Sequence, residues 1–232
     1  MRRRLVIAGI AVVVLLLAAA GGLTYLLSSH HAPGAFALSS PAASGASGGL
    51  AGSWKITKGS EVGYRVKEKF INQPSTTEAV ARTEQVTGGL SVQLAGGSYV
   101  ATSIDFKADL STLVSQDKYA TYQVYQRDFF IRRIYLQTDL YPNAEFRSTS
   151  VSVASSLVPG PAKLDVTGML TVHGVTKSVT TSLQVQLTGQ VIEVVGSISV
   201  DMHDFNVDPP DISFTKAESG VLIEYHLLLQ HA

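Results

Sequence analysis

Three side chains in the sequence have the chemical type required for acid–base catalysis: His173, Asp204 and Glu68. A histidine beside a carboxylate can move protons for a hydrolase or an isomerase. The surrounding residues do not support this chemistry, because the sequence has no H-E-x-x-H motif, no G-x-S-x-G motif and no phosphate-cradling glycine loop. His173 falls between two predicted strands, where a turn residue needs no partner. We therefore assign no catalytic residue and keep an acid–base enzyme only as an alternative.

Metal and redox centres are also not expected. The chain has no cysteine, which excludes thiol catalysis, cysteine-ligated zinc, iron–sulfur clusters and disulfide bonds. His30 and His31 are adjacent, but they lie in a segment of small residues and are interpreted as an incidental pair. We predict neither a metal nor a cofactor.

The charge distribution argues against nucleic acid as a partner. The 18 basic and 18 acidic residues balance, and Arg2–Arg4 lie before every acidic residue, so the rest of the chain is mildly acidic. No cluster of lysine and arginine with interleaved aromatic residues is present, although nucleic-acid binding needs such a basic surface.

Glu68 has an unusual position in its predicted strand. It alternates in phase with the apolar residues Tyr64 and Val66. Burial of an unpaired carboxylate is costly. We therefore expect Glu68 to lie beyond the buried part of the strand, to pair with an arginine, or to line a wet cavity mouth.

The N-terminus carries an export signal. Arg2–Arg4 precede the apolar run Leu5–Leu27, which as a helix would be about 34 Å long and could cross a ~30 Å hydrocarbon core. The positive-inside rule then places the remainder outside the cytoplasm. Residues 1–27 are thus predicted to be a single-pass signal anchor in the cell membrane. The alternative is a signal peptide cleaved near Ala20 or Ala37, which would leave a periplasmic or secreted protein.

Residues 28–53 are uncharged and rich in serine, glycine, alanine and proline. Such a segment buries too little apolar area to offset the entropy of ordering. We predict that it is a flexible tether between the anchor and a folded domain of residues 54–232.

The folded domain shows apolar and polar residues in strict alternation, which predicts strands with one buried face. About eight such segments are present, at 62–70, 86–94, 100–110, 145–153, 164–172, 178–187, 192–202 and 221–230. Glycine and proline turn signals separate them. We predict an all-β, antiparallel, eight-stranded sheet closed into a barrel, because closure removes exposed strand edges.

One segment has helical spacing instead. Aromatic residues recur every three or four positions between Gln116 and Leu136, among them Tyr122 and Phe129. Ser115 or Asp117 could cap the start of this helix. The segment is interpreted as one helix flanking the barrel, or alternatively as the lining of a ligand mouth, and Arg127 and Asp128 within it are expected to be structural.

Four stretches in this order resemble the YceI-like family of lipid-binding barrels. They are 54–66, which begins with Trp-Lys-Ile; 127–146, which contains Arg-Asp and Leu-Tyr-Pro; 166–177, VTGMLTVHGVTK; and 204–207, DFNV. The third is the most specific. The resemblance implies a lipocalin-like barrel with an internal tunnel for a long apolar chain such as a polyisoprenoid, in exported proteins not established as enzymes.

If the barrel holds such a tunnel, as the resemblance implies, its lining is formed by the apolar residues that face inward. The predicted lining residues are Tyr64, Val66, Phe106, Tyr122, Phe129, Phe146, Ile198, Val200, Phe205 and Tyr225. The expected partners are an isoprenoid or other long-chain lipid and, through the N-terminal helix, the membrane.

The chain departs from the family pattern in three places that bear on the ligand. Gly59-Ser60 stands where a His-Ser pair is common, the loop Asn206–Ile212 carries Pro209-Pro210 in place of a short glycine-containing run, and Phe70–Gln85 is long and polar. No head-group site is therefore assigned. A barrel with a filled interior and a structural or interaction role remains the main alternative.

Overall fold

The computed structural model describes residues 30–40, 49–71, 75–119, 124–153 and 161–232. The apolar run Leu5–Leu27, and with it the predicted anchor or signal peptide, lies outside these ranges. Within them, no helix combines the length and the apolar character needed to cross a bilayer.

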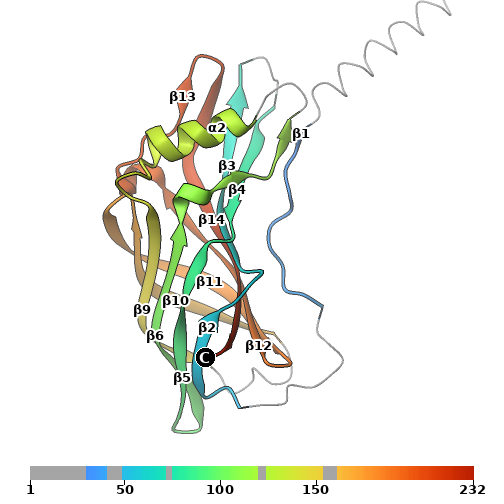
Figure 1. Ribbon diagram of the computed structural model, residues 1–232, viewed down its shortest axis with the longest axis vertical. Helices are drawn as coiled ribbons and strands as arrows, with labels where there is room; N and C mark the ends of the chain where they lie inside the picture. The colour runs from blue at the N-terminus through green and yellow to red at the C-terminus, as the bar shows by residue number, and fades with distance from the viewer. Residues whose placement is uncertain (1–29, 41–48, 72–74, 120–123, 154–160) are drawn as a thin grey trace, which may run out of the picture.

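The main body is an antiparallel barrel of eight strand paths (Figure 1). Two paths are interrupted: β2 (Gly52–Ile56) leads into β3 (Glu61–Phe70), and β4 (Thr77–Thr83) leads into β5 (Val86–Ala95). The other six are β6 (Ser98–Asp109), β9 (Asn143–Val153), β10 (Ala162–Val172), β11 (Val175–Thr188), β12 (Val191–Asp201) and β14 (Thr215–His231). Pairing of β14 with β12 on one side and with β2 and β3 on the other closes the ring. The predicted all-β antiparallel barrel is confirmed.

The alternation of side chains explains why these segments form strands. On β10, Val166 and Leu170 are buried inside the barrel while Met169 is 46% exposed outside it. The break between β2 and β3 is held by Ser60, whose hydroxyl donates to the carbonyl of Thr57 (2.9 Å) and accepts from the amide of Leu228 (2.9 Å).

The connection predicted at residues 70–85 is wrong in its second half, which forms β4. Ala79, Val80 and Ala81 are all buried, so the strand lacks the alternation that identifies a sheet with one wet face. Residues 116–117 bind the edge of this strand: the backbone amide of Gln116 donates to the carbonyl of Val80 (2.8 Å), and the carboxylate of Asp117 accepts from the amide of Val80 (3.1 Å).

One end of the barrel is splayed. There β4 pairs with β3 and with β7 (Val114–Ser115), not with β6. The chain between β6 and β9 enters this gap through the short 3-10 turn η1 (Leu110–Thr112). It then forms β8 (Lys118–Tyr119), the helix α2 (Val124–Phe130) and the π turn η2 (Ile131–Tyr135). Figure 1 shows α2 lying across this end of the barrel, which we call the α2 end.

The predicted helix of residues 116–136 is therefore correct only in its second half. Asp117 does not cap it, because its carboxylate accepts from the amide of Val80 (3.1 Å) and from Arg127. Ser115 does not cap the helix either, because its amide and its hydroxyl both donate to the carboxylate of Asp128. These hydrogen bonds engage both side chains elsewhere, and α2 starts at Val124.

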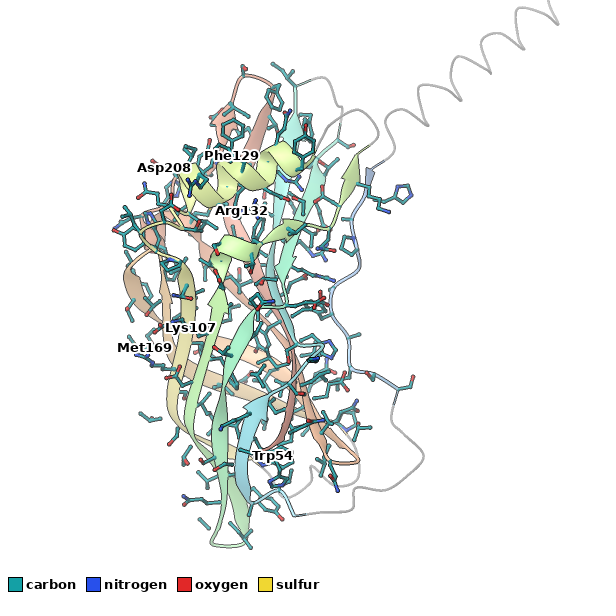
Figure 2. The ribbon with its side chains drawn as sticks, in the orientation of Figure 1. Trp54, Lys107, Phe129, Arg132, Met169 and Asp208 are labelled. Carbon is teal, nitrogen blue, oxygen red and sulfur yellow. The ribbon has the colours of Figure 1, made fainter. Side chains whose placement is uncertain are left out.

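The opposite end is sealed by Trp54, labelled low in Figure 2. Trp54 is 1% exposed, donates its indole N–H to the carbonyl of Leu50 (2.9 Å) and packs on the ring of His231 (3.9 Å between centroids). The barrel thus has one plugged end and one covered by a helix.

The segment Pro33–Ser39, which we call the strap and which belongs to the predicted tether of residues 28–53, lies along the outside of the barrel. Arg65 and Arg82 donate to the carbonyls of Pro33 (2.8 Å) and Gly34 (2.9 Å). Further along, the guanidinium of Arg82 stacks on Phe36 (3.8 Å). The strap carbonyls thus provide hydrogen-bond acceptors for two arginines of the sheet. Both arginines also pair with the buried carboxylate of Glu224.

Ser39 anchors the far end of the strap to Glu193. Its amide and hydroxyl donate to the Glu193 carboxylate (3.0 and 2.9 Å), which also accepts from Gln186 (2.6 Å) and contacts His226 Nε2 (2.8 Å). Burial opposes ionisation of Glu193, but the hydrogen bonds from Gln186, Ser39 and His226 outweigh it and hold the pKa of Glu193 below its usual range.

The strap is expected to loosen in acid. A carboxyl whose pKa is lower in the folded chain stabilises the fold fully above its unfolded pKa of about 4.3, and that contribution is lost as the pH falls through the lower folded value. A spin label at the exposed position Ala37 (Ala37→Cys) should be immobile at pH 7 and mobile below pH ~4, while circular dichroism shows the barrel intact. In Glu193→Gln the label should already be more mobile at pH 7. An unchanged spectrum across this range would contradict the assigned role of Glu193.

Candidate ligand cavity

The barrel interior contains two adjoining apolar cavities, of about 170 and 130 Å³. Val62, Ala144 and Ile223 border both, so the cavities meet at these three residues. The first cavity lies toward Leu50 and the plugged end, and the second lies beneath η2 at the α2 end. Together they form an elongated apolar space along the barrel.

Eight of the ten residues predicted as tunnel lining border these cavities. Phe106, Phe146, Ile198 and Tyr225 line the first, and Tyr64, Val66, Val200 and Phe205 line the second. Phe129 does not join them: it is 54% exposed on the outer side of α2, as Figure 2 shows. Tyr122 lies outside the described residues.

Two glycines make room for the aromatic rings of the first cavity. A Cβ on Gly168 would lie 2.4 Å from the ring of Phe146, and one on Gly196 would lie 2.3 Å from the hydroxyl of Tyr225. A side chain at either position would clash with a ring that lines the cavity. Gly168 and Gly196 therefore leave room for these rings, although alternation alone marks them only as inward positions.

Polar groups in the first cavity are satisfied within the protein. The hydroxyls of Thr181 and Tyr225 are 2.7 Å apart, and Thr181 donates to the carbonyl of Ser197 (2.8 Å). Burial raises the pKa of Tyr225 to about 12, so its phenol is neutral at physiological pH. Lys107 and Glu145 border this cavity but approach each other at 4.0 Å on the partly exposed side of the sheet. The first cavity therefore favours a ligand segment without polar atoms.

The second cavity is closed by Ile131, Tyr135 and Leu136 from η2 and the residue after it. Tyr64 borders it from the barrel wall. Burial raises the pKa of Tyr64, with the positive charge of Arg127 opposing this effect, so the phenol stays neutral. The helical segment thus covers the cavity with its inner face, while Phe129 points away.

A buried polar cluster ties α2 to the barrel. Arg127 donates to Glu68 (3.0 Å), to Asp117 and to the hydroxyl of Ser115 (2.8 Å). The Asp128 carboxylate accepts from the amide of Ser115 (3.1 Å). Burial raises the pKa of Glu68, and the charge and hydrogen bond of Arg127 counteract it. Of the three expectations for Glu68, pairing with an arginine is the one the structure shows.

Asp117 and Ser115 are members of this cluster that the sequence did not identify. Their side chains are polar and their spacing matched a helix start, so nothing local distinguished a cap from a buried ion-pair partner. Glu68 and Arg127 are far apart in the chain, so the sequence alone could not predict that they form an ion pair.

The three residues considered for acid–base chemistry do not converge. His173 Nδ1 lies 3.2 Å from the carbonyl oxygen of Phe205, and its ring packs on Tyr141 (4.5 Å). The Asp204 carboxylate faces Lys177 (3.8 Å), and Glu68 is paired with Arg127. Across the described ranges, no group of three or more histidine or acidic side chains is arranged to hold a metal ion.

Comparisons with known proteins agree with this geometry. Residues 54–227 match the model of the YceI-like domain family. A polyisoprenoid-binding domain from Saccharophagus degradans has a similar structure, with a TM-score of 0.58 and 18% identity over 77% of this chain and 98% of that one. Burkholderia cenocepacia BcnA is also similar, with a TM-score of 0.51 and 22% identity over 73% and 95% of the two chains. At these identities the two structures show the fold alone. Among curated proteins, none matches this sequence.

Proposed function

We propose that this chain, which belongs to the YceI-like domain family, binds one long apolar lipid chain such as a polyisoprenoid inside its barrel. The observation that carries the proposal is the pair of adjoining apolar cavities that meet at Val62, Ala144 and Ile223. The polyisoprenoid-binding domain of similar fold supports the choice of ligand class. The lipid would be bound rather than transformed, since His173, Asp204 and Glu68 each have other partners.

The size of the cavities fits part of a prenyl chain. An apolar cavity of about 150 Å³ stays dry and accepts benzene. Each of the two cavities is close to that size, so together they hold roughly twelve carbon atoms, or two to three isoprene units. A longer chain would have to widen the interior or extend past η2 at the α2 end. The affinity would come from burial of the apolar surface of the lipid, which contributes about 0.8 kcal/mol for each buried CH₂.

We further propose that the protein is exported and held at the membrane by residues 1–27. The support is the length of Leu5–Leu27 and the preceding Arg2–Arg4. A lipid carrier tethered in this way would stay close to the source of its ligand. Cleavage of the signal would instead leave a periplasmic or secreted carrier.

The direct test of ligand binding is mass spectrometry of organic extracts from protein purified under native conditions. We expect a long-chain prenyl lipid or a related apolar lipid at up to one molecule per chain. The control is the same protein washed with organic solvent, refolded and incubated with a defined C10–C55 prenol series. A lipid-free extract, together with no uptake of any prenol, would favour the filled-barrel alternative.

A further inference from the structure

We infer that the α2 end of the barrel is a docking face for a lipid bilayer, through which the ligand passes; this inference rests on the proposed function. Large apolar side chains gather at this end although they are solvent-exposed. They are Tyr125, Phe129 and Phe130 on α2, Ile134 on η2, Ile71 after β3, and Ile212 and Phe214 at the hairpin of β13 (Asp211–Ile212) with β14. We call these seven side chains the apical residues.

The apical residues belong to two neighbouring parts of the same end. The amide of Ile71 donates to the carbonyl of Phe214 (3.0 Å), which joins the tip of β3 to the β13 hairpin. Figure 1 shows this hairpin and the tips of β3 and β4 beside and above α2, at the end opposite Trp54. Exposed apolar patches of this kind mark protein or membrane interaction sites.

The helical segment is apolar on two sides. Ile131 and Tyr135 face the second cavity, whereas Phe129, Phe130 and Ile134 are about half exposed. The polar residue Gln126 and the basic residue Arg133 are also exposed on this segment. Its outer side therefore combines large apolar side chains with a basic one, as in helices that lie in a membrane interface, and the apolar side chains lack an apolar medium.

The strap indicates that this medium is a bilayer. β1 (His30–His31) pairs with β8, with His30 opposite Tyr119 and His31 opposite Lys118, so the chain reaches the barrel beside α2. The strap contacts at Pro33, Gly34 and Ser39 then hold it along the wall. The apolar run ends at Leu27, three residues before His30, a distance of at most about 10 Å in extended chain. A membrane-spanning run would therefore bring the α2 end, and not the plugged end, against the bilayer.

Docking at this end would give the ligand a dry route. The second cavity is lined on this side by Ile131 and Tyr135 of η2 and by Leu136, so η2 lies between the cavity and the apical side. This π turn has wider hydrogen bonding than an α-helix, and such turns occur frequently at functional sites. Displacement of η2 would connect the cavity to the acyl chains, and the prenyl chain would not cross water.

The absence of native cysteine allows a site-specific test on the full chain. A fluorescent label is placed at Phe129→Cys in one sample and at Leu94→Cys in another, and each protein is reconstituted into phosphatidylcholine–phosphatidylglycerol vesicles with brominated acyl chains. Leu94 is the matched control because it is 63% exposed, against 54% for Phe129, and lies on the β5–β6 hairpin at the far end. We expect at least twofold stronger quenching at position 129 than at position 94.

Equal quenching at the two positions would overturn the docking face, and so would a chain that fails to float with the vesicles. If Phe129→Cys does not fold, Tyr125→Cys on the same helix replaces it. Lipid extracted from the same samples separates the two proposals. Bound prenyl lipid without preferential quenching overturns docking alone, whereas quenching without any bound lipid overturns the proposed function and leaves the docking face.

Discussion

Replacing Ala144 with phenylalanine is expected to weaken binding of long prenyl chains at least 100-fold while the barrel remains folded. Ala144 borders both cavities where they meet, and a phenyl ring there would block passage of a chain from one cavity to the other. Exclusion of about six carbons from one cavity removes roughly 5 kcal/mol of transfer free energy, at ~0.8 kcal/mol per CH₂. Titration with a fluorescent prenol should show at least a 100-fold weaker Kd, while a short C10 prenol loses much less.

The control for this experiment is Met169→Phe, which adds a ring of the same size to the outside of the barrel. Met169 is 46% exposed and is labelled on the outer wall in Figure 2. It should bind both prenols as the native protein does. Unchanged binding of the long prenol by Ala144→Phe would show that the ligand does not occupy the joined cavities. A melting temperature several degrees lower in Ala144→Phe, with no uptake by the native chain, would support a filled interior.

Replacing Arg127 with alanine is expected to cause the largest loss of stability. Arg127 is 8% exposed and is the buried cation that contacts both Glu68 and Asp117. Removing one member of a buried ion pair leaves an uncompensated charge and typically costs about 3–5 kcal/mol. For a domain of this size, the melting temperature should fall by roughly 6–20 °C.

Two comparisons test this explanation. Arg133→Ala, in the same helical segment, removes an arginine whose side chain is half exposed beside Asp139, and should change the stability by less than about 0.5 kcal/mol. Acidification should partly restore Arg127→Ala, because burial already raises the pKa of Glu68 and protonation removes its unpaired charge. Equal melting temperatures for the two variants, or no recovery in acid, would argue against a buried ion-pair role.

Binding by the Arg127→Ala variant would also report on the position of α2. The ion pairs attach α2 to β3, and η2 covers the second cavity. Below the melting temperature of the variant, a loosened helix should speed both uptake and release of a prenol. Stopped-flow fluorescence can separate the two effects. A loosened helix raises the rate constants, whereas a loss of folded protein lowers the amplitude of the fluorescence change.

The strands and the inward residues were predictable from sequence because alternation is a local property. Any strand with one buried face must place every second residue inside, so positions such as Phe106 and Ile198 could be assigned without knowing their neighbours. β4 escaped this reasoning because tertiary neighbours cover both of its faces. Tyr64 and Tyr225 were likewise assigned to the interior correctly, but not to separate cavities.

The sequence by itself determined most of the strands, their antiparallel arrangement, the inward faces and the family. Each of these follows from local periodicity or from short motifs such as 166–177. Only the tertiary structure decided that Glu68 pairs with Arg127, that the strap residues from Pro33 to Ser39 bind the wall, and that two apolar cavities adjoin at Ala144. These depend on distances between residues far apart in the chain and on the volume left when side chains pack, and neither quantity is encoded in the spacing of residue types.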